Sequence, residues 1–256
     1  MDSLSTLLLQ QDGTFEAPWS QAPCIDATPL IDVATLIAGA RRAVVVAAQP
    51  HDEVLGSGGL LADMAGFGLD TLIVAVTDGE CSHAGSRTWS RAGLRDKRVT
   101  ESMQALNVLG VDPLNVMRLR IRHGYVRDAY DELSRRLVDI LRPGDIVFAP
   151  WAGSGDADHE GCNNAVSHAV LEHAMSDEAP VWMWNWADPG AAALPLSRVL
   201  RVEISADALA RKQRALALCE TQLHRDPDVP GTPHLSADKL ARFLRPYESL
   251  LYAPDI

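Results

Sequence analysis

Residues 44–59 read VVVAAQPHDEVLGSGG, and this stretch decides the fold. The run from Val44 to Ala48 combines β-branched residues with alanines, a composition typical of a buried strand. A polar loop, Gln49–Glu53, follows it, and a glycine-punctuated apolar segment from about Val54 indicates a helix. In an open α/β sheet, groups just past the carboxyl end of a strand line the ligand crevice. The imidazole and the two carboxylates of this loop are therefore candidate functional groups.

A second polar cluster, Asp156-Ala157-Asp158-His159, follows another candidate strand. Imidazole nitrogen together with carboxylate oxygen is the ligand set of catalytic zinc, which lowers the pKa of a bound water. We therefore expect a metal-assisted hydrolase in which Asp52 and His159 bind the metal and Asp158 orients an imidazole. The alternative for a single aspartate, Asp52 or Asp156, is that it caps the helix that follows. Two such clusters at equivalent strand ends favour the functional interpretation.

Apolar strands alternate with amphipathic helices along most of the chain. The candidate strands are Ala43–Ala48, Thr71–Thr77, Asn115–Ile121, Asp145–Ala149, Val181–Asn185 and Arg198–Ile204. The candidate helices are Val54–Phe67, Ser90–Leu109, Tyr125–Leu141, His159–Met175, Ala206–Glu220 and Ser236–Leu244. This order predicts an α/β fold, in which a mostly parallel sheet carries helices on both faces. Residues 1–36 hold three prolines and no clear periodicity, so we expect an N-terminal arm and then one domain over 37–256.

Composition limits the class of partner. The chain has 256 residues, and its net charge of −11 argues against nucleic acid, whose binding needs a basic footprint. The four cysteines stand far apart and form no CxxC pair, unlike a disulfide framework or a structural zinc site. We see no basic, apolar leader and no run of roughly 20 apolar residues, so we expect a cytoplasmic protein without a membrane partner. The expected partner is a small-molecule substrate, and the sequence leaves a homo-oligomer open.

Several long segments resemble the PIG-L/LmbE-like family of zinc-dependent N-deacetylases. These segments are VVVAAQPHDEVLGSGG, VTDGECSHAGSR at 76–87, the APW and DADHEG motifs within 149–161, and VWMWNWADPG at 181–190. The resemblance implies a Rossmann-like fold. It also implies a metal-dependent hydrolase that removes an acetyl group from an N-acetylated, sugar-containing small molecule.

The first family motif is altered in this chain. It is typically His-Pro-Asp-Asp-Glu, in which the His and the second Asp bind zinc and the first Asp is the general base. Here Gln49 stands at the ligand His, His51 stands at the base, and ligand Asp52 is retained. A neutral amide carbonyl is a weaker zinc ligand than an imidazole. The resemblance therefore implies a Zn²⁺ site with a weakened first ligand.

The second family motif is altered at one position. It is typically His-x-Asp-His, and its last His is the third zinc ligand. This chain keeps that ligand as His159 and the preceding acid as Asp158, but it carries Asp156 at the first His. Asn185 stands where close relatives tend to carry His.

Three interpretations stay open. In the first, His51 rotates into the coordination sphere beside Asp52 and His159, and an aspartate of the second motif is the base. In the second, the metal site is weakened or lost, and the fold serves binding or an altered chemistry. In the third, Gln49, Asp52 and His159 surround a metal in a working deacetylase, and His51 is the base.

Further residues are candidate substrate contacts. The resemblance implies that loop 78–89 contacts substrate, and it holds His83 and Arg87, whose guanidinium suits an anion or a sugar; the alternative is a solvated loop. His123 follows a third strand and is either in the pocket or exposed.

Other conspicuous residues are expected to be structural. The basic residues between 91 and 98 share a helix with Glu101, and ion pairs at helical spacing are the favoured account of most of them. The tryptophans between 182 and 186 alternate on one strand and favour core packing over sugar stacking. The glycines of 56–59 lack the G-x-G-x-x-G spacing, so close helix packing explains them better than phosphate binding.

Overall fold

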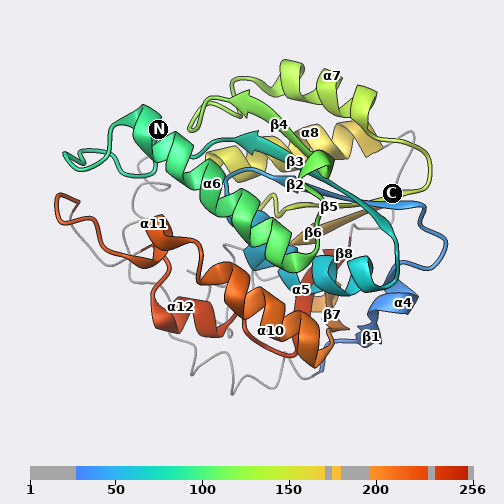
Figure 1. Ribbon diagram of the computed structural model, residues 1–256. Helices are drawn as coiled ribbons and strands as arrows, with labels where there is room; N and C mark the ends of the chain where they lie inside the picture. The colour runs from blue at the N-terminus through green and yellow to red at the C-terminus, as the bar shows by residue number, and fades with distance from the viewer. Residues whose placement is uncertain (1–26, 171–174, 180–195, 230–233, 253–256) are drawn as a thin grey trace.

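The computed structural model describes residues 27–170, 175–179, 196–229 and 234–252, and Figure 1 shows their arrangement. The strands are β1 (Leu30–Asp32), β2 (Arg42–Ala47), β3 (Asp70–Thr77), β4 (Val116–Ile121), β5 (Asp145–Pro150), β6 (Met175–Ala179), β7 (Val199–Glu203) and β8 (Tyr247–Tyr252). The helices are α4 (Val33–Leu36), α5 (Asp52–Gly66), α6 (Arg91–Leu109), α7 (Tyr130–Ile140), α8 (Ala157–Val170), α10 (Ala206–Leu216), α11 (Glu220–Leu223) and α12 (Ala237–Ala241). Two short 3₁₀ turns, η1 (Pro113–Asn115) and η2 (Leu196–Arg198), precede β4 and β7.

Within the described residues the strands form one eight-stranded sheet in the order β1-β7-β8-β6-β5-β2-β3-β4. Neighbouring strands run parallel except where β8 pairs with β6 and β7. Helices follow β2, β3, β4 and β5, as crossover connections between parallel strands require. The predicted α/β fold with a mostly parallel sheet is confirmed.

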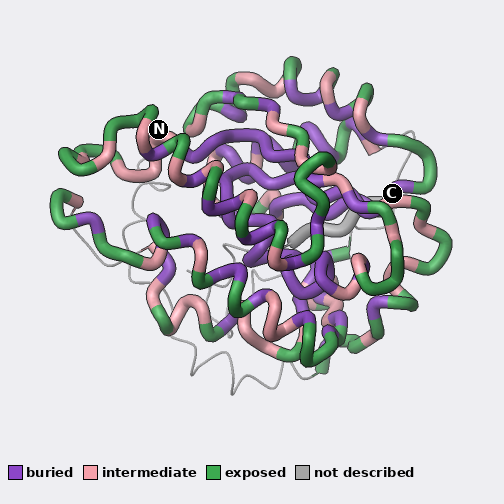
Figure 2. The backbone as a smooth tube through the Cα atoms, in the orientation of Figure 1, coloured by how far each residue is buried: buried purple, intermediate pink, exposed green. Residues whose placement is uncertain are grey.

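Alternate residues of β2 point to opposite faces of the sheet and join two separate apolar cores. Ala43 and Val45 face the core that α5, α6 and α10 build, whereas Val44 and Val46 face α7 and α8. Figure 1 shows α7 and α8 on one side of the sheet and α5, α6 and α10 on the other, and Figure 2 shows the central strands buried. Burial on both faces explains why β2 is an unbroken apolar run instead of an alternating one.

Two glycines let α5 lie close to its neighbours. A Cβ at Gly59 would lie 2.4 Å from Cδ1 of Ile204, which directly follows β7, and 2.9 Å from Oε1 of Glu248. A Cβ at Gly58 would lie 3.2 Å from Cγ of Lys212 on α10. Side chains there would force α5 away from both elements, so these glycines serve close packing, as predicted.

The apolar pattern does not predict β1, β6 or β8. Strand β6 has the sequence MSDEA, which carries two acids in five residues, and its pairing with β5 and β8 makes it a strand. Helix α8 is described as far as Val170, and Met175, the predicted end of this helix, instead begins strand β6. The predicted strand 181–185, with its tryptophans and Asn185, lies outside the described residues.

The predicted arm is only partly described. Residues 1–26 lie outside the described part of the chain, and Leu30–Asp32 pairs with β7 at the edge of the sheet. In the same described ranges, Cys81, Cys162 and Cys219 are free thiols. Those ranges also contain no helix whose length and apolar character would suffice to cross a bilayer.

Candidate active site

The two clusters of acid and imidazole side chains follow two neighbouring strands, β2 and β5, at the same edge of the sheet. Strand β2 pairs with β5 on one side and with β3 on the other, so the chain connections diverge at the end of β2. In open α/β sheets this topological switch point is where ligands bind. The loop after β2 delivers residues 49–53, and the loop after β5 delivers residues 156–159.

The first loop folds back onto the start of α5. His51 is left-handed, with φ 97° and ψ −20°, and helix α5 begins at the next residue. Oδ2 of Asp52 accepts a hydrogen bond from the backbone N–H of Gln49 at 2.8 Å, and Oε2 of Glu53 accepts one from the N–H of His51 at 3.0 Å. These carboxylates lie at the positive end of the helix dipole, which stabilises negative charge. The loop therefore presents Asp52 in a fixed position.

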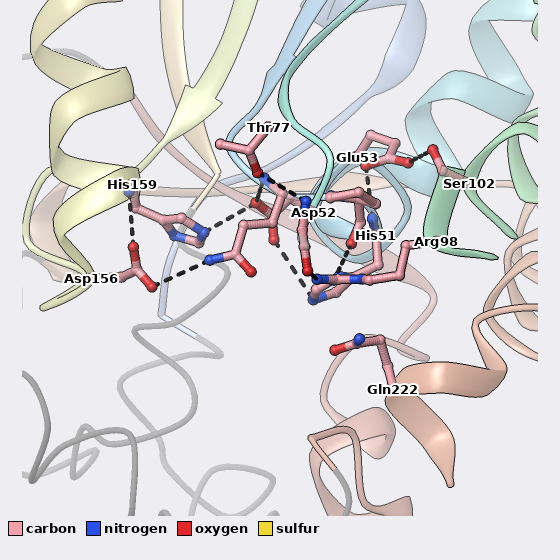
Figure 3. Close-up of polar contacts among 12 residues, drawn as sticks. His51, Asp52, Glu53, Thr77, Arg98, Ser102, Asp156, His159 and Gln222 are labelled. Carbon is pink, nitrogen blue, oxygen red and sulfur yellow. Dashed lines mark hydrogen bonds and ion pairs between the residues drawn. The ribbon is translucent and has the colours of Figure 1, made fainter. Parts of the chain in front are cut away.

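Asp52 and His159 meet directly. Nε2 of His159 lies 3.0 Å from Oδ2 of Asp52, and both side chains are buried. Burial opposes ionisation of the carboxyl, but the neighbouring His159 and His51 outweigh it and lower the pKa of Asp52 to about 2. Burial also disfavours the imidazolium, yet the Asp52 and Asp156 carboxylates raise the pKa of His159 to about 9. Figure 3 shows this pair at the centre of the polar network.

His51 is held by Arg98, on α6. The guanidinium Nη2 donates to Nδ1 of His51 at 2.8 Å, so Nδ1 is an acceptor and the proton of the neutral ring lies on Nε2. Burial lowers the pKa of His51 well below its ordinary value, with Asp52 opposing and the Arg98 charge adding to the effect. Nε2 of His51 lies 3.8 Å from Oδ1 of Asp52. A ring in this state donates a hydrogen bond from Nε2, which weighs against the base role.

Sequence reasoning did not assign Arg98 to the site. Its side chain is buried and also donates to the carbonyl oxygens of Gly79 at 3.0 Å and Pro50 at 2.9 Å. Gln222 approaches the same guanidinium from α11 (Figure 3). A signal was present in the sequence, because Leu94, Arg98 and Ser102 recur at helical spacing on the buried face of α6.

Asp156 and Asp158 mainly bind backbone. Oδ1 of Asp156 accepts from the N–H groups of Asp158 at 2.8 Å and His159 at 3.1 Å, which is the capping geometry weighed above. Its Oδ2 faces the Gln49 side-chain amide at 3.5 Å.

Both oxygens of Asp158 hold the loop that follows β4. They accept from the N–H of Gly124 at 2.6 Å and the N–H of Val126 at 3.1 Å. Burial raises the pKa of Asp158, and these two hydrogen bonds oppose the rise. Asp158 thereby fixes the loop that carries His123 beside the start of α8.

The candidate substrate contacts lie on other loops than the Asp52–His159 pair. Nδ1 of His83 lies 2.8 Å from Oγ of Ser82, and the His83 side chain lines a small cavity that also contains His234. Arg87 is exposed, and its backbone N–H donates to Asp228 at 2.9 Å. The backbone N–H of His123 donates to Oε1 of Glu80 at 3.0 Å.

His234 was also missed from the sequence. It is half-buried by exposed area, and desolvation of its ring, with the Arg98 charge adding to the effect, lowers its pKa to about 4. It lines the small cavity beside His83, and its charge would repel those of His51, His83 and His123. A lone histidine in a proline-containing loop gives no sequence signal of such a position.

The donor set meets the requirements of a metal ion only in part. Among the described residues, no group of three His, Cys, Asp or Glu side chains is placed to hold a metal ion. Oδ1 of Asp52 is buried and makes no hydrogen bond within that part of the chain. Asp52 and His159 thus offer two suitable donors, and the Gln49 amide, whose nitrogen faces Asp156, offers its oxygen as a third.

Comparison with known proteins identifies the fold and a family domain. Residues 44–170 match the model of the PIG-L family, described as GlcNAc-PI de-N-acetylase. The described fold resembles N,N'-diacetylchitobiose deacetylase from Pyrococcus horikoshii, with a TM-score of 0.60, 18% identity, and coverage of 94% of this chain and 93% of that one. Identity this low supports the fold alone.

Two curated relatives are similar in sequence. The first is 1D-myo-inositol 2-acetamido-2-deoxy-alpha-D-glucopyranoside deacetylase of Corynebacterium glutamicum (strain R), 26% identical over 165 residues, or 55% of each chain. The protein of the same name from Corynebacterium diphtheriae is 27% identical over 230 residues, covering 71% of this chain and 76% of its own. The chain thus spans about half the length of the C. glutamicum relative.

Proposed function

This chain belongs to the PIG-L family through residues 44–170, and we propose that it hydrolyses the acetamide of an N-acetylated, sugar-containing small molecule. The observation that carries the proposal is the Asp52–His159 pair, 3.0 Å apart, at the switch point of the sheet. The names of both Corynebacterium relatives describe the deacetylation of an acetamido sugar, which supports this substrate class.

We propose that Asp52, His159 and the amide oxygen of Gln49 would hold a zinc ion. Two of these donors are ordinary zinc ligands, and the third is a weak one, so we expect looser binding than a site with two imidazoles gives. When bound, the ion would polarise the amide carbonyl and lower the pKa of water.

The proposed roles of His51 and Asp156 follow from the hydrogen bonds that these side chains already make. His51 donates from Nε2, because Arg98 occupies its Nδ1, and so can stabilise negative charge developing on a substrate oxygen. Asp156 is the proposed base, because its Oδ2 makes only a long 3.5 Å contact with Gln49, whereas both oxygens of Asp158 are bound to backbone.

The outer loops are the proposed sugar contacts. His83 and Arg87 lie on loop 78–89, and His123 precedes the glycine that Asp158 holds. Polar side chains on several loops around a rigid centre are the usual source of specificity in such folds.

The test is release of acetate from the inositol glycoside named above and from N,N'-diacetylchitobiose. Purified protein is assayed after chelation and after addition of one equivalent of Zn²⁺. We expect release to require metal and to fall about 10²-fold or more in Asp52→Asn and Asp156→Asn. Asp139→Asn, an exposed position on α7, is the matched control and should retain the full rate. Absence of release from both substrates, with and without metal, would contradict the proposal.

A second candidate function is a binding module that has lost its catalytic metal. It is favoured by Gln49 at the ligand position and by the lack of a His, Cys, Asp or Glu trio in the described residues. Such a protein would bind the same sugars without releasing acetate. The double variant Gln49→His/His51→Asp separates the cases: new activity shows that these two residues disabled the site, and continued inactivity counts against that explanation.

A further inference from the structure

Another cavity is lined by none of the candidate catalytic, metal-binding or substrate-contact residues described above. Its volume is about 620 Å³, within the range of small-molecule sites. Side chains from the edge strand β4, from the start of α6 and from the loop after β3 line it. The arginines among them are Arg95, Arg118, Arg120 and Arg122.

These four arginines outnumber the carboxylates that line the same cavity, which are Asp78, Glu80 and Asp96. The local excess of positive charge contrasts with the net charge of −11 for the whole chain. The lining charges of this cavity therefore favour an anion, whereas the net charge of the chain does not.

Most of the lining charges already have partners. Arg118 forms an ion pair with Asp78, and Arg95 forms one with Asp96 at 2.8 Å. Cζ of Arg122 lies 4.0 Å from the ring centre of Tyr125 in a cation–π contact.

Arg120 differs from these neighbours. In the part of the chain that the structure describes, it takes part in no hydrogen bond and no ion pair, and its side chain is exposed to the cavity. Its charge also acts on Arg118: burial lowers the pKa of Arg118, the Asp78 carboxylate opposes this, and the Arg120 charge adds to the lowering. Arg118 has a carboxylate partner in Asp78 and Arg120 has none among the described residues, so a bound oxyanion would supply the counter-charge that Arg120 lacks.

Arg120 reaches the cavity from a strained backbone conformation. Ala75 pairs with Arg118 and Thr77 pairs with Ile121, so one residue of β3 opposes two of β4 and the strand bulges. Arg120 lies in this bulge with φ +56°, a left-handed conformation that glycine adopts far more easily. Among the described residues, His51 of the candidate active site is the one other non-glycine residue with positive φ. Such strain at a non-glycine residue is typical of functional positions.

We propose that this cavity is a binding site for the oxyanion group, phosphate or carboxylate, of a small molecule, held chiefly by Arg120 together with Arg118 and Arg122. The guanidinium fork matches both groups in bidentate geometry. The proposal does not depend on the hydrolytic activity, because none of the three arginines contacts Asp52 or His159.

The test is isothermal titration of the full chain with inorganic phosphate, glucose 6-phosphate and citrate at constant ionic strength. The variants are Arg120→Gln and Arg120→Gly, and the control is Arg214→Gln, an exposed arginine on α10. We expect saturable binding to the wild type and the control, and binding at least about tenfold weaker in both Arg120 variants. The glycine variant relieves the backbone strain, so its melting temperature should be no lower than that of the wild type, and its weaker binding cannot then be ascribed to unfolding.

The order of affinities identifies the ligand. Tighter binding of the two phosphates assigns a phosphate ligand, and tighter binding of citrate assigns a carboxylate one. The proposal is overturned if no anion binds saturably to the wild type, or if both Arg120 variants bind with unchanged affinity.

Discussion

The buried Lys212–Glu248 ion pair allows a quantitative test of how this sheet is held together. Nζ of Lys212 donates to both carboxylate oxygens of Glu248, at 2.8 and 2.7 Å, and to the carbonyl oxygen of Leu55 at 2.8 Å. Oε1 of Glu248 also accepts from the N–H of Gly59 at 2.8 Å. The side chains of Lys212 and Glu248 are 0% and 4% exposed. The pair thus joins α10 and β8 to two backbone groups one helical turn apart in α5.

The expected cost follows from this burial. Lys212→Met leaves a carboxylate without its counter-ion in the core, and breaking a buried pair in this way costs about 3–5 kcal/mol. That is a large share of a total stability of roughly 5–15 kcal/mol. The double variant Lys212→Met/Glu248→Leu removes both charges and should differ from the wild type by about 1 kcal/mol or less, because replacing such a pair with apolar side chains is often neutral.

Urea denaturation of the wild type, both single variants and the double variant gives the coupling energy as a double-mutant cycle. The matched control is Lys97–Glu220, which has the same 2.7 Å separation but side chains 35% and 55% exposed. Lys97→Met should cost no more than about 1 kcal/mol. If Lys212→Met costs as little as Lys97→Met, or if the two single costs simply add in the double variant, the reasoning from burial is refuted.

The stability of Lys212→Met should also depend on pH differently from that of the wild type. Burial raises the pKa of Glu248, and the Lys212 charge opposes this in the wild type. Without Lys212 the rise is larger, so above the unfolded-state value of 4.5 the native state binds more protons than the unfolded state. Stability of Lys212→Met should therefore fall, relative to the wild type, as pH rises above about 4.5. A cost that is constant between pH 5 and 8 would contradict this sign.

Other perturbations have similarly direct outcomes. Gly79→Ala should destabilise the fold more than Gly85→Ala in urea denaturation: both glycines have positive φ, but a Cβ at Gly79 would lie 2.1 Å from Nη1 of Arg98, and one at Gly85 has no atom within 4 Å. Gly85→Ala, the control, should lower the free energy of unfolding by about 1 kcal/mol. An equal loss in the two variants would show that the contact with Arg98 does not destabilise Gly79→Ala. Asp158→Asn, which weakens one of two hydrogen bonds to the loop after β4, should cost about 1–2 kcal/mol and speed amide hydrogen exchange in that loop.

The pattern of the chain predicts the centre of the sheet well because burial there is visible in the sequence. Strands β2 and β3 and helix α5 begin and end within two residues of the predicted bounds, since each is an apolar run bounded by polar or glycine residues. Strand β6 lacks such a run and depends on its neighbours. Helix α7 starts at Tyr130 and not at 125, because the backbone at 124 and 126 binds Asp158 instead of entering a helix.

The sequence also predicts which residues meet in the candidate site, but not their hydrogen-bond partners. That Asp52 and His159 should meet follows from the parallel sheet alone, since residues after adjacent strands share an edge. The partners of these residues do not follow from it. Whether Asp156 caps a helix or accepts a proton depends on the direction of two carboxylate oxygens, which spacing along the chain does not determine.

Arg98 and His51 determine each other's state through their hydrogen bond. A buried guanidinium needs acceptors, and Arg98 finds the carbonyl oxygens of Gly79 and Pro50 and the ring nitrogen of His51. An imidazole 2.8 Å from that cation is kept neutral, with its remaining proton on the nitrogen that faces Asp52. The position that supplies a base in the resembled motif therefore supplies a donor here. Another group must then accept the proton, and of the two aspartates of the second motif only Asp156 has a carboxylate oxygen that accepts no backbone hydrogen bond.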